Sequence, residues 1–242
     1  MQTITERQRE ILMAIIREFM SNADEVGSLA LLEKYKLGVS SATVRNEMAK
    51  LMELGLLEKS HISSGRYPTD QALRMYVSNI LGSSSLNPLI TVEIRQGIFR
   101  DRFSKESVVN AILKILSEET ESVAFIVIDS ISRYWGISNL FKYEELREWE
   151  KLQRVINILE DSDFLNNMMR KYSGSGVSLV IGEESGIKGL GECSMVFTTL
   201  PFWDSTNAHI GILGSKRMDY ARSIPALREV QSSMKNAMRG WS

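Results

Sequence analysis

Side chains that can read the edges of DNA bases gather within residues 40–55, SSATVRNEMAKLMELG. Asn can pair bidentately with adenine, Arg with guanine, and Thr can contact a thymine methyl group or a phosphate. Ser40 or Ser41 can cap a helix here and Gly55 can end it, because serine accepts a free backbone N–H and glycine adopts left-handed backbone angles without strain. The stretch therefore predicts a helix whose exposed side chains can enter the major groove.

The two faces of this expected helix differ in character. The inward stripe is apolar and consists of Val44, Met48 and Leu51. The outward face is small and polar and consists of Ala42, Asn46, Ala49, Lys50 and Glu53, flanked by Thr43 and Arg45. Small outward residues allow close approach to a groove. An ordinary amphipathic helix with a solvated face is the alternative, and the flanking sequence has to decide between the two.

The residues before this stretch are expected to form two further helices. Residues 5–22 open with the capping-box pattern TERQ and continue with apolar residues at helical spacing. Ser28 can cap a short second helix, whose inward residues are Leu31, Leu32 and Tyr35. Gly38 can then form the tight turn into the third helix. Helix, helix, turn and helix follow one another in the order of a helix-turn-helix motif.

A hairpin is expected directly after the third helix. Residues 56–60 and 66–68 are short extended candidates joined by a turn-rich segment. Such a hairpin is typical of a wing, which contacts phosphates or the minor groove, and its basic side chains are Lys59, His61 and Arg66. A fourth helix is expected to begin at Thr69 or Asp70. A winged helix-turn-helix is the economical interpretation.

One long block of the chain resembles the signature of the heat-inducible transcription repressors of the HrcA family. It runs from Gly38 to Thr69 and reads GVSSATVRNEMAKLMELGLLEKSHISSGRYPT, and the segment ITERQREIL near the start is similar as well. The resemblance covers residues 3–77. It implies that the groove and backbone contacts are Ser41, Thr43, Arg45, Asn46 and Lys50, and that the wing tip is Ser64, Gly65 and Arg66.

The family resemblance also implies a function. It implies a negative regulator of transcription that binds an inverted-repeat operator in double-stranded DNA as a homodimer, silences heat-shock (chaperone) operons and is released on heat stress. It further implies that the chaperonin GroEL promotes the active form. These partners and this mechanism are expectations from the family alone.

The rest of the chain is expected to hold a linker and a second domain. We assign residues 1–81 to the DNA-binding domain, 82–103 to a linker or connector, and 104–242 to a regulatory and dimerisation domain. Within the connector, Ile90, Val92 and Ile94 alternate as in a strand, although the family resemblance allows a helix instead.

The second domain alternates helical and extended patterns. Helices are expected from Ser104 and over 144–159, 164–172 and 225–238, and strands over 122–129, 177–181, 195–200 and 208–213, with strand and turn between 131 and 141. A mainly antiparallel sheet with helices beside it is an α+β domain. A weaker resemblance to the family implies that it is GAF-like. Between Asp129 and Gly136 there is no room for the dimerisation subdomain inserted in longer family members.

Composition and cysteine content narrow the class of protein. The 242 residues carry 43% hydrophobic and 24% charged residues with a formal net charge of -1, which is typical of an ordinary soluble protein without a broad basic surface. Cys193 is the single cysteine, so no internal disulfide is expected, and a buried core thiol in a reducing cytoplasm is favoured. We expect a cytoplasmic protein without a signal peptide or a membrane span.

Catalysis is not expected from this sequence. His61 and His209 are the only histidines and lack the spacing of a metal site or a triad, so we expect no enzyme, metal or cofactor. Two alternatives to the repressor remain. One is a ligand-sensing regulator whose second domain holds a small molecule near Trp135, Phe202 and Trp203. The other is a winged helix used only for docking to a protein.

Overall fold

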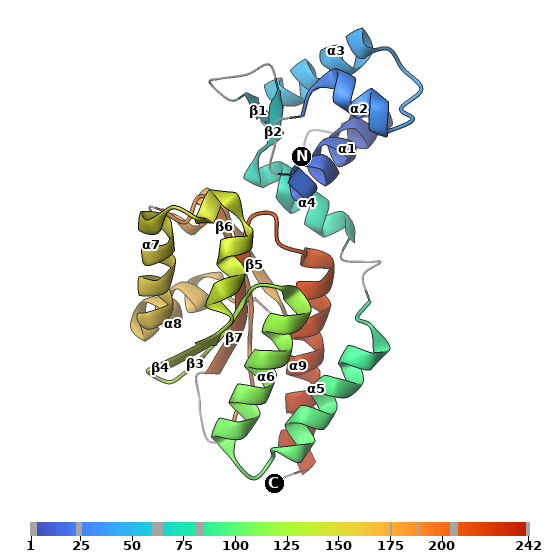
Figure 1. The fold of residues 1–242 in the computed structure, drawn as a ribbon. Coiled ribbons are helices and arrows are strands. Elements are labelled where there is room, and N and C mark those ends of the chain that lie inside the picture. Colours follow the sequence, from blue (N-terminus) through green and yellow to red (C-terminus); the bar gives the residue numbers. More distant parts are fainter. Residues whose placement is uncertain are drawn as a thin grey trace. The chain divides into compact units, whose positions relative to one another are not determined.

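Two units make up the chain, Met1–Gly82 and Ser83–Ser242, and each is described by itself. The structure is a computed structural model, and it describes residues 4–22, 26–59, 65–80, 85–174, 176–187, 189–203 and 208–240. Helices and a two-stranded antiparallel ribbon form the first unit (Figure 1). Its elements are α1 (Glu6–Asn22), α2 (Ser28–Lys34), α3 (Ser41–Glu53), β1 (Leu57–Lys59), β2 (Arg66–Pro68) and α4 (Asp70–Ile80). The order predicted from the sequence is confirmed.

The core of the first unit lies where α1 packs against α3, α4 and β2. The fully buried side chains include Ile11, Leu12, Ile15, Ile16, Leu31, Val44, Leu51, Leu73 and Val77. The predicted capping box at the start of α1 is confirmed, because the Thr5 N–H donates to Gln8 Oε1 at 2.9 Å and the Gln8 N–H donates to Thr5 Oγ1 at 3.3 Å.

The prediction that Ser28 caps the second helix is wrong. The cap residue of α2 is Gly27, whose backbone is extended, and α2 begins at Ser28 itself. The Ser28 hydroxyl is instead 3.0 Å from the Ser41 hydroxyl at the start of α3. Of the three residues predicted to face inward, Leu31 is buried, whereas Leu32 and Tyr35 are half-buried.

The end of the β1–β2 ribbon formed by Lys59 and Arg66 is held from both sides. On one side β2 pairs with β1, so that Lys59 lies opposite Arg66. On the other side Val26 and Arg66 exchange two backbone hydrogen bonds of 3.1 and 3.2 Å. This bridge ties the segment between α1 and α2 to the ribbon, and Arg66 is the residue common to both pairings.

An antiparallel sheet organises the second unit. Its elements are α5 (Pro88–Arg100), α6 (Lys105–Thr120), β3 (Val123–Ile128), β4 (Ile131–Trp135), η1 (Ile137–Lys142), η2 (Glu144–Leu146), α7 (Trp149–Glu160), α8 (Ser162–Tyr172), β5 (Ser178–Ile181), η3 (Gly182–Ser185), β6 (Cys193–Thr199), β7 (Ala208–Ser215) and α9 (Tyr220–Gly240). Five strands lie in the order β4-β3-β7-β6-β5, and every neighbouring pair is antiparallel. The prediction of an α+β architecture is confirmed.

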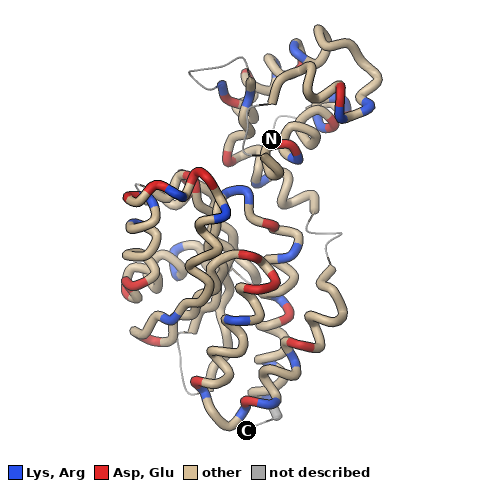
Figure 2. The backbone as a smooth tube through the Cα atoms, viewed as in Figure 1, with Lys and Arg blue, Asp and Glu red and all other residues tan. Residues whose placement is uncertain are grey.

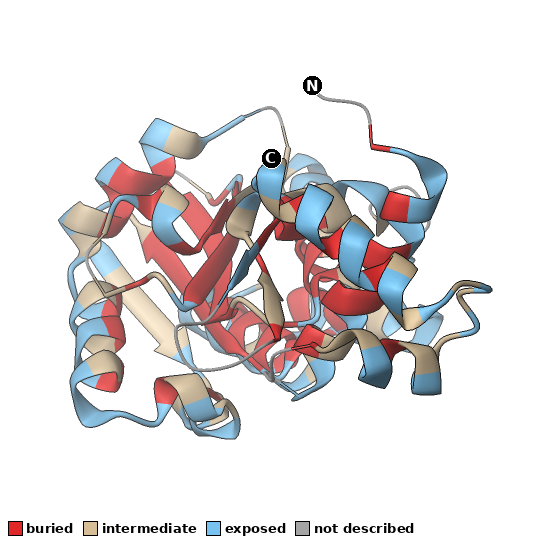
Figure 3. Cartoon of the chain, turned by 90° about the horizontal axis from the view of Figure 1, so that it is seen from above, coloured by how far each residue is buried: buried red, intermediate tan, exposed pale blue. Residues whose placement is uncertain are grey.

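Helices cover both faces of this sheet. α6 and α9 pack on one face, with α5 lying outside them, and α7 and α8 cover the other (Figure 1). Buried residues follow the strands and the inner sides of the helices (Figure 3). The core between the sheet and α7 and α8 includes Val123, Phe125, Val127, Leu152, Leu165, Met169, Phe197 and Leu213. Cys193 belongs to this core, and burial raises the pKa of its thiol to about 12, so the prediction of a buried thiol is confirmed.

The connector predicted over residues 82–103 contains a helix, and the strand alternative for Ile90, Val92 and Ile94 is wrong. Asn87 caps α5 by accepting the Leu89 N–H at 2.9 Å, and Pro88 occupies the first turn, where its missing N–H does no harm. α5 packs on α6 and α9, and Gly97 allows the close approach, because a Cβ there would be 3.1 Å from Ile115.

The helix predicted over 144–159 starts later than expected. Residues 144–146 form the separate turn η2, because the Glu145 carboxylate is held by Arg217 from the connection between β7 and α9. Two parallel bonds of 2.9 Å join these side chains, and the Ser215 hydroxyl also donates to Glu145. Burial opposes ionisation, but these hydrogen bonds outweigh it and lower the pKa of Glu145.

A two-residue turn joins β3 to β4. Ile128 pairs with Ile131, so only Asp129 and Ser130 form the connection. The backbone of Asp129 is left-handed, with φ of 54°. The Ser162 hydroxyl donates to the Ser130 carbonyl at 2.9 Å, so α8 holds the turn in place. The chain between Asp129 and Gly136 consists of the end of this turn and of β4.

Candidate nucleic-acid interface

α3 has the cap and the two faces that the sequence predicts. Ser40 is the cap, and its hydroxyl accepts the Thr43 N–H at 3.2 Å. Val44, Met48 and Leu51 are buried against the rest of the unit. The exposed residues are Ala42, Arg45, Asn46, Ala49, Lys50 and Glu53. The outward face therefore offers a guanidinium and an amide group between two alanines, followed by the ammonium group of Lys50.

The carboxylate of Glu47 on α3 is held away from the exposed face of the helix by two hydrogen bonds. Lys50 donates to Glu47 Oε1 at 3.0 Å, and Gln8 of α1 donates to Glu47 Oε2 at 3.0 Å. The bond from Lys50 is the main cause that lowers the pKa of Glu47. The Glu47 side chain is mostly buried, whereas that of Lys50 is mostly exposed. Lys50 thus remains accessible to an external phosphate.

The structure brings basic residues of α3 and of the β1–β2 ribbon together. Arg45, Lys59 and Arg66 line one hollow of about 480 Å³, together with Gly27, Ser28, Leu29 and Met48. The Arg66 guanidinium donates to the Gly65 carbonyl at 2.9 Å, which directs it along the ribbon. Three positive charges around one hollow produce the local basic surface that the chain's net charge of -1 hides.

Other predicted contact residues lie elsewhere. Ser41 and Thr43 are half-buried near the start of α3, with hydroxyls 3.0 Å from those of Ser28 and Ser40 respectively. Lys50 does not line the hollow. Ser64 and His61 lie outside the described residues. Ser28 and Leu29 were not predicted as site residues, although the order of a helix-turn-helix motif places the start of its first helix near the DNA backbone.

Basic and acidic residues are interspersed along the backbone of both units (Figure 2). The sequence pI of about 6.2 reflects this balance. The hollow between α3 and the ribbon is therefore a local feature rather than part of a broad positive surface, and specific contacts would have to supply much of any affinity for DNA.

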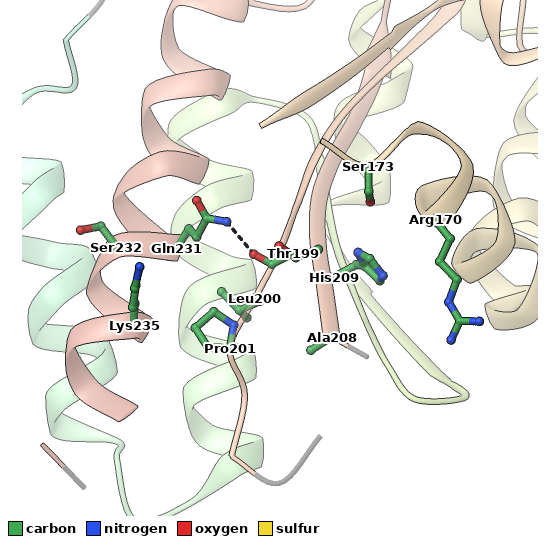
Figure 4. Close-up of a pocket in the computed structure, with 10 residues that line it drawn as sticks. All are labelled: Arg170, Ser173, Thr199, Leu200, Pro201, Ala208, His209, Gln231, Ser232 and Lys235. Carbon is green, nitrogen blue, oxygen red and sulfur yellow. Dashed lines mark hydrogen bonds between the residues drawn. The ribbon is translucent and has the colours of Figure 1, made fainter. Parts of the chain in front are cut away.

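A second hollow, of about 790 Å³, lies at the ends of β6 and β7 (Figure 4). Arg170 and Ser173 of the α8 region border it on one side of the strands, and α9 contributes Gln231, Ser232 and Lys235 on the other side. His209 lies in β7 between β3 and β6 and is buried.

Within the described residues, Nδ1 of His209 has no hydrogen-bond partner. Burial and the nearby Arg170 lower the pKa of this imidazole. The three aromatic residues proposed for a ligand pocket do not line this hollow. Trp135 is half exposed. Phe202 is buried, and its ring packs edge to face on the ring of Trp203, with 4.5 Å between the ring centroids.

In the described part of the chain, no group of three or more His, Cys, Asp or Glu side chains is arranged to hold a metal ion. None of the helices described is both long and apolar enough to cross a membrane.

An exposed helix that carries Arg, Asn and Lys side chains beside a basic ribbon, joined to a separate α+β unit, is an organisation found in transcription regulators. The sequence model of the HrcA protein C-terminal domain matches residues 52–224. The chain therefore belongs to the HrcA family, and the resemblance seen in the sequence is confirmed.

Relatives and a solved structure agree with this assignment. The chain is 23% identical to a heat-inducible transcription repressor HrcA of Clostridium botulinum (strain Alaska E43 / Type E3), over 99% of each chain. It is 25% identical to the repressor of the same name from Clostridium acetobutylicum, over 96% of each. A crystal structure described as a hypothetical protein at 2.2 Å resolution has a TM-score of 0.82 and 20% identity, covering 99% of this chain and all of that one, and it shares the fold.

The first of these alignments also shows a difference in length. It extends over 343 positions, whereas this chain has 242 residues. A long part of the Clostridium botulinum protein therefore has no counterpart here. This chain is a short member of the family.

Proposed function

We propose that this protein is a sequence-specific DNA-binding repressor of heat-shock operons. The observation that carries the proposal is the convergence of Arg45 on α3 with Lys59 and Arg66 on the ribbon. Membership of a family whose relatives are named heat-inducible transcription repressors supports it.

In this proposal the first unit, residues 1–81, is a winged helix-turn-helix domain. α3 enters the major groove, where Asn46 pairs with adenine and Arg45 with guanine. Ser41, Thr43 and Lys50 contact the groove wall or backbone. The ribbon is the wing, and its residues Lys59, Ser64, Gly65 and Arg66 contact phosphates or the minor groove.

The second unit is the regulatory part of the proposal, a GAF-like domain over residues 104–242. The protein binds an inverted repeat as a homodimer, which places one α3 in each half-site. When one monomer is bound, the linked second monomer is held at a high effective concentration near its own half-site. This gain in affinity compensates for the weak binding expected from the modest charge of each monomer. Heat releases the repressor in the cytoplasm when this unit loses its active fold or its dimer contact, and the family resemblance adds the chaperonin GroEL as the factor that restores it.

The experiment starts from a pool of duplexes with a random central segment, which is selected on the purified full chain at physiological salt. The enriched sequence is then titrated as a full duplex, as a single half-site and as a scrambled control. We expect an inverted repeat that binds far more tightly than either control. Equal, salt-sensitive binding to all three duplexes would refute sequence-specific repression.

The hollow beside His209 favours a second candidate function, a sensor of a small anionic ligand. Arg170 and Lys235 supply positive charge, and the buried Nδ1 of His209 supplies a polar group for a ligand to bind. The test is thermal stabilisation by the low-molecular-mass fraction of a cell extract, with Arg170→Ala and Lys235→Ala as controls. No shift, or the same shift in both variants, rejects the sensor.

A further inference from the structure

The outward face of α5 is apolar and uncovered within the second unit. Its inward residues Ile94, Gly97 and Ile98 are buried where α5 contacts α6 and α9. Its outward residues are Leu89, Val92 and Phe99, which are 75%, 48% and 63% exposed, and Phe103 in the turn that follows is 87% exposed. Exposed apolar side chains are ordinary when single, but a contiguous group of them marks an interaction surface.

The spacing of these residues is that of a helix-pairing seam. On α5 itself, Leu89, Val92, Gln96 and Phe99 are separated by three, four and three residues, and Phe103 follows four residues later in the turn beyond the end of the helix at Arg100. This is the a and d spacing of a heptad repeat, in which one helix packs along another. The Arg102 guanidinium lies over the rings of both Phe99 and Phe103, at 4.1 and 4.2 Å from their centroids. These cation–π contacts stabilise the two rings in their exposed positions.

We propose that this seam binds the same seam of a second copy of the chain, with the two α5 helices antiparallel about a two-fold axis at Gln96. In that arrangement Leu89 meets Phe103 of the second copy, and Val92 meets Phe99. Each aliphatic residue then faces an aromatic one, and the two Gln96 amides meet each other at the axis.

Charge complementarity selects the antiparallel arrangement. Glu93 of one copy faces Arg100 of the other across the antiparallel seam, so opposite charges meet. A parallel pair would instead place Arg95 near Arg100 of the second copy, and it would stack Phe99 on Phe99. Both arginines also have partners within their own chain: the Arg95 guanidinium donates to Glu229 Oε1 at 2.8 Å, and the Arg100 guanidinium donates to the two carboxylate oxygens of Asp101 at 3.3 and 3.1 Å, so Glu93 of the second copy would join Asp101 around Arg100.

An antiparallel seam also suits an inverted-repeat operator, a point that depends on the proposed function. α5 has 13 residues and is about 20 Å long. Antiparallel helices begin at opposite ends of the seam, and each N-terminal unit is joined to the start of its α5. The two units are therefore attached at separate points along one line, as two half-sites about 34 Å apart require.

The first test measures the oligomeric state of the full chain by light scattering after size-exclusion chromatography at micromolar concentration. We expect a dimer for the native chain, and a monomer with unchanged melting temperature for Phe99→Asp and for Phe103→Asp. Trp149→Asp is the matched control, since Trp149 is a 68% exposed aromatic residue on α7. A monomeric native chain, or a Phe103→Asp protein that remains dimeric, overturns the proposal.

The second test determines the direction of the helices by cysteine cross-linking. Buried Cys193 leaves an introduced cysteine as the reactive thiol. A mixture of Leu89→Cys and Phe103→Cys chains should form a disulfide-linked dimer of one chain of each kind, whereas Leu89→Cys alone should form none. Cross-linking of Leu89→Cys with itself overturns the antiparallel seam.

DNA titration separates failure of the seam from failure of the proposed function. Binding of the inverted repeat by a Phe99→Asp protein that is still a dimer rejects the seam and leaves the repressor intact. A dimer that depends on Phe99 but binds no duplex selectively supports the seam and rejects the repressor.

Discussion

The substitution Asn46→Ala tests the proposed base contact most directly. Asn46 is exposed on the outward face of α3, so its truncation removes no core packing. We expect the free energy of unfolding to change by less than about 0.5 kcal/mol, because alanine also has the higher helix propensity. A loss of DNA affinity in this variant therefore reports a lost contact rather than a lost fold.

The expected loss of affinity depends on the number of half-sites occupied. A bidentate contact to a base contributes about 1–3 kcal/mol of discrimination. A homodimer on an inverted repeat makes this contact twice, so Asn46→Ala should weaken binding to the full repeat by about 2–6 kcal/mol and to a half-site by about half as much. Each 1.4 kcal/mol corresponds to about a tenfold change in Kd.

The assay is fluorescence anisotropy at one fixed salt concentration, with full-repeat, half-site and scrambled duplexes. Glu53→Ala is the matched control, since Glu53 is exposed near the end of the same helix. Unchanged affinity for the full repeat, or an equal loss on the scrambled duplex, would show that Asn46 does not read a base. A melting curve for each variant checks the fold.

Three other predictions follow from the described contacts. Lys59→Ala should weaken binding regardless of base sequence and reduce the slope of log K against log salt by about 0.9 for each half-site occupied, as measured by titration over several salt concentrations. Gly136→Ala should lower the free energy of unfolding by at least about 1 kcal/mol in a denaturant titration, because φ is 87° and its Cβ would be 1.8 Å from Ser117 Oγ. Glu145→Gln should lower the free energy of unfolding at pH 7 by about 2 kcal/mol, since it breaks a mostly buried pair with Arg217. Because the folded-state pKa of Glu145 is lowered, its stabilisation is present above pH 4.5 and declines as the pH falls further, so native and variant melting temperatures should converge in acid.

Local patterns predict the first unit well because each of its helices carries its own signals. The stripe of Val44, Met48 and Leu51 is buried as expected, and the capping box of Thr5 and Gln8 forms. Ser28 shows the limit of such signals. Serine is a residue type that often caps a helix. The hydroxyl of Ser28, however, contacts that of Ser41, 13 residues further along the chain, and this contact cannot be read from the local sequence.

The second unit depends more on contacts between distant residues. The alternation of Ile90, Val92 and Ile94 suggests a strand in the connector, while the Asn87-Pro88 pair, which predicts a helix start, carries the better local signal. The late start of α7 could not be predicted, because it depends on Glu145 meeting Arg217 from the other end of the unit. The hollow beside His209 likewise requires the sheet order, which brings β7 between β3 and β6.

For the candidate interface, residue types on α3 were predictable from helical periodicity alone. The approach of Arg45 to Lys59 and Arg66 was not, because it depends on how the ribbon packs beside α3. The seam on α5 was present in the sequence as a three-and-four spacing. It became an interaction surface only when the structure showed that the opposite side of α5 is the one that packs on α6 and α9.

The turn between β3 and β4 gives this chain a convenient position for protein engineering. Asp129 and Ser130 are enclosed by the paired residues Ile128 and Ile131, so the chain leaves and re-enters the sheet at adjacent points. A folded module whose own ends lie close together, such as a small reporter domain, can be spliced between such points with little loop-closure entropy. The strand pairing would then determine where the module sits, and the module would report directly on whether the sheet is intact.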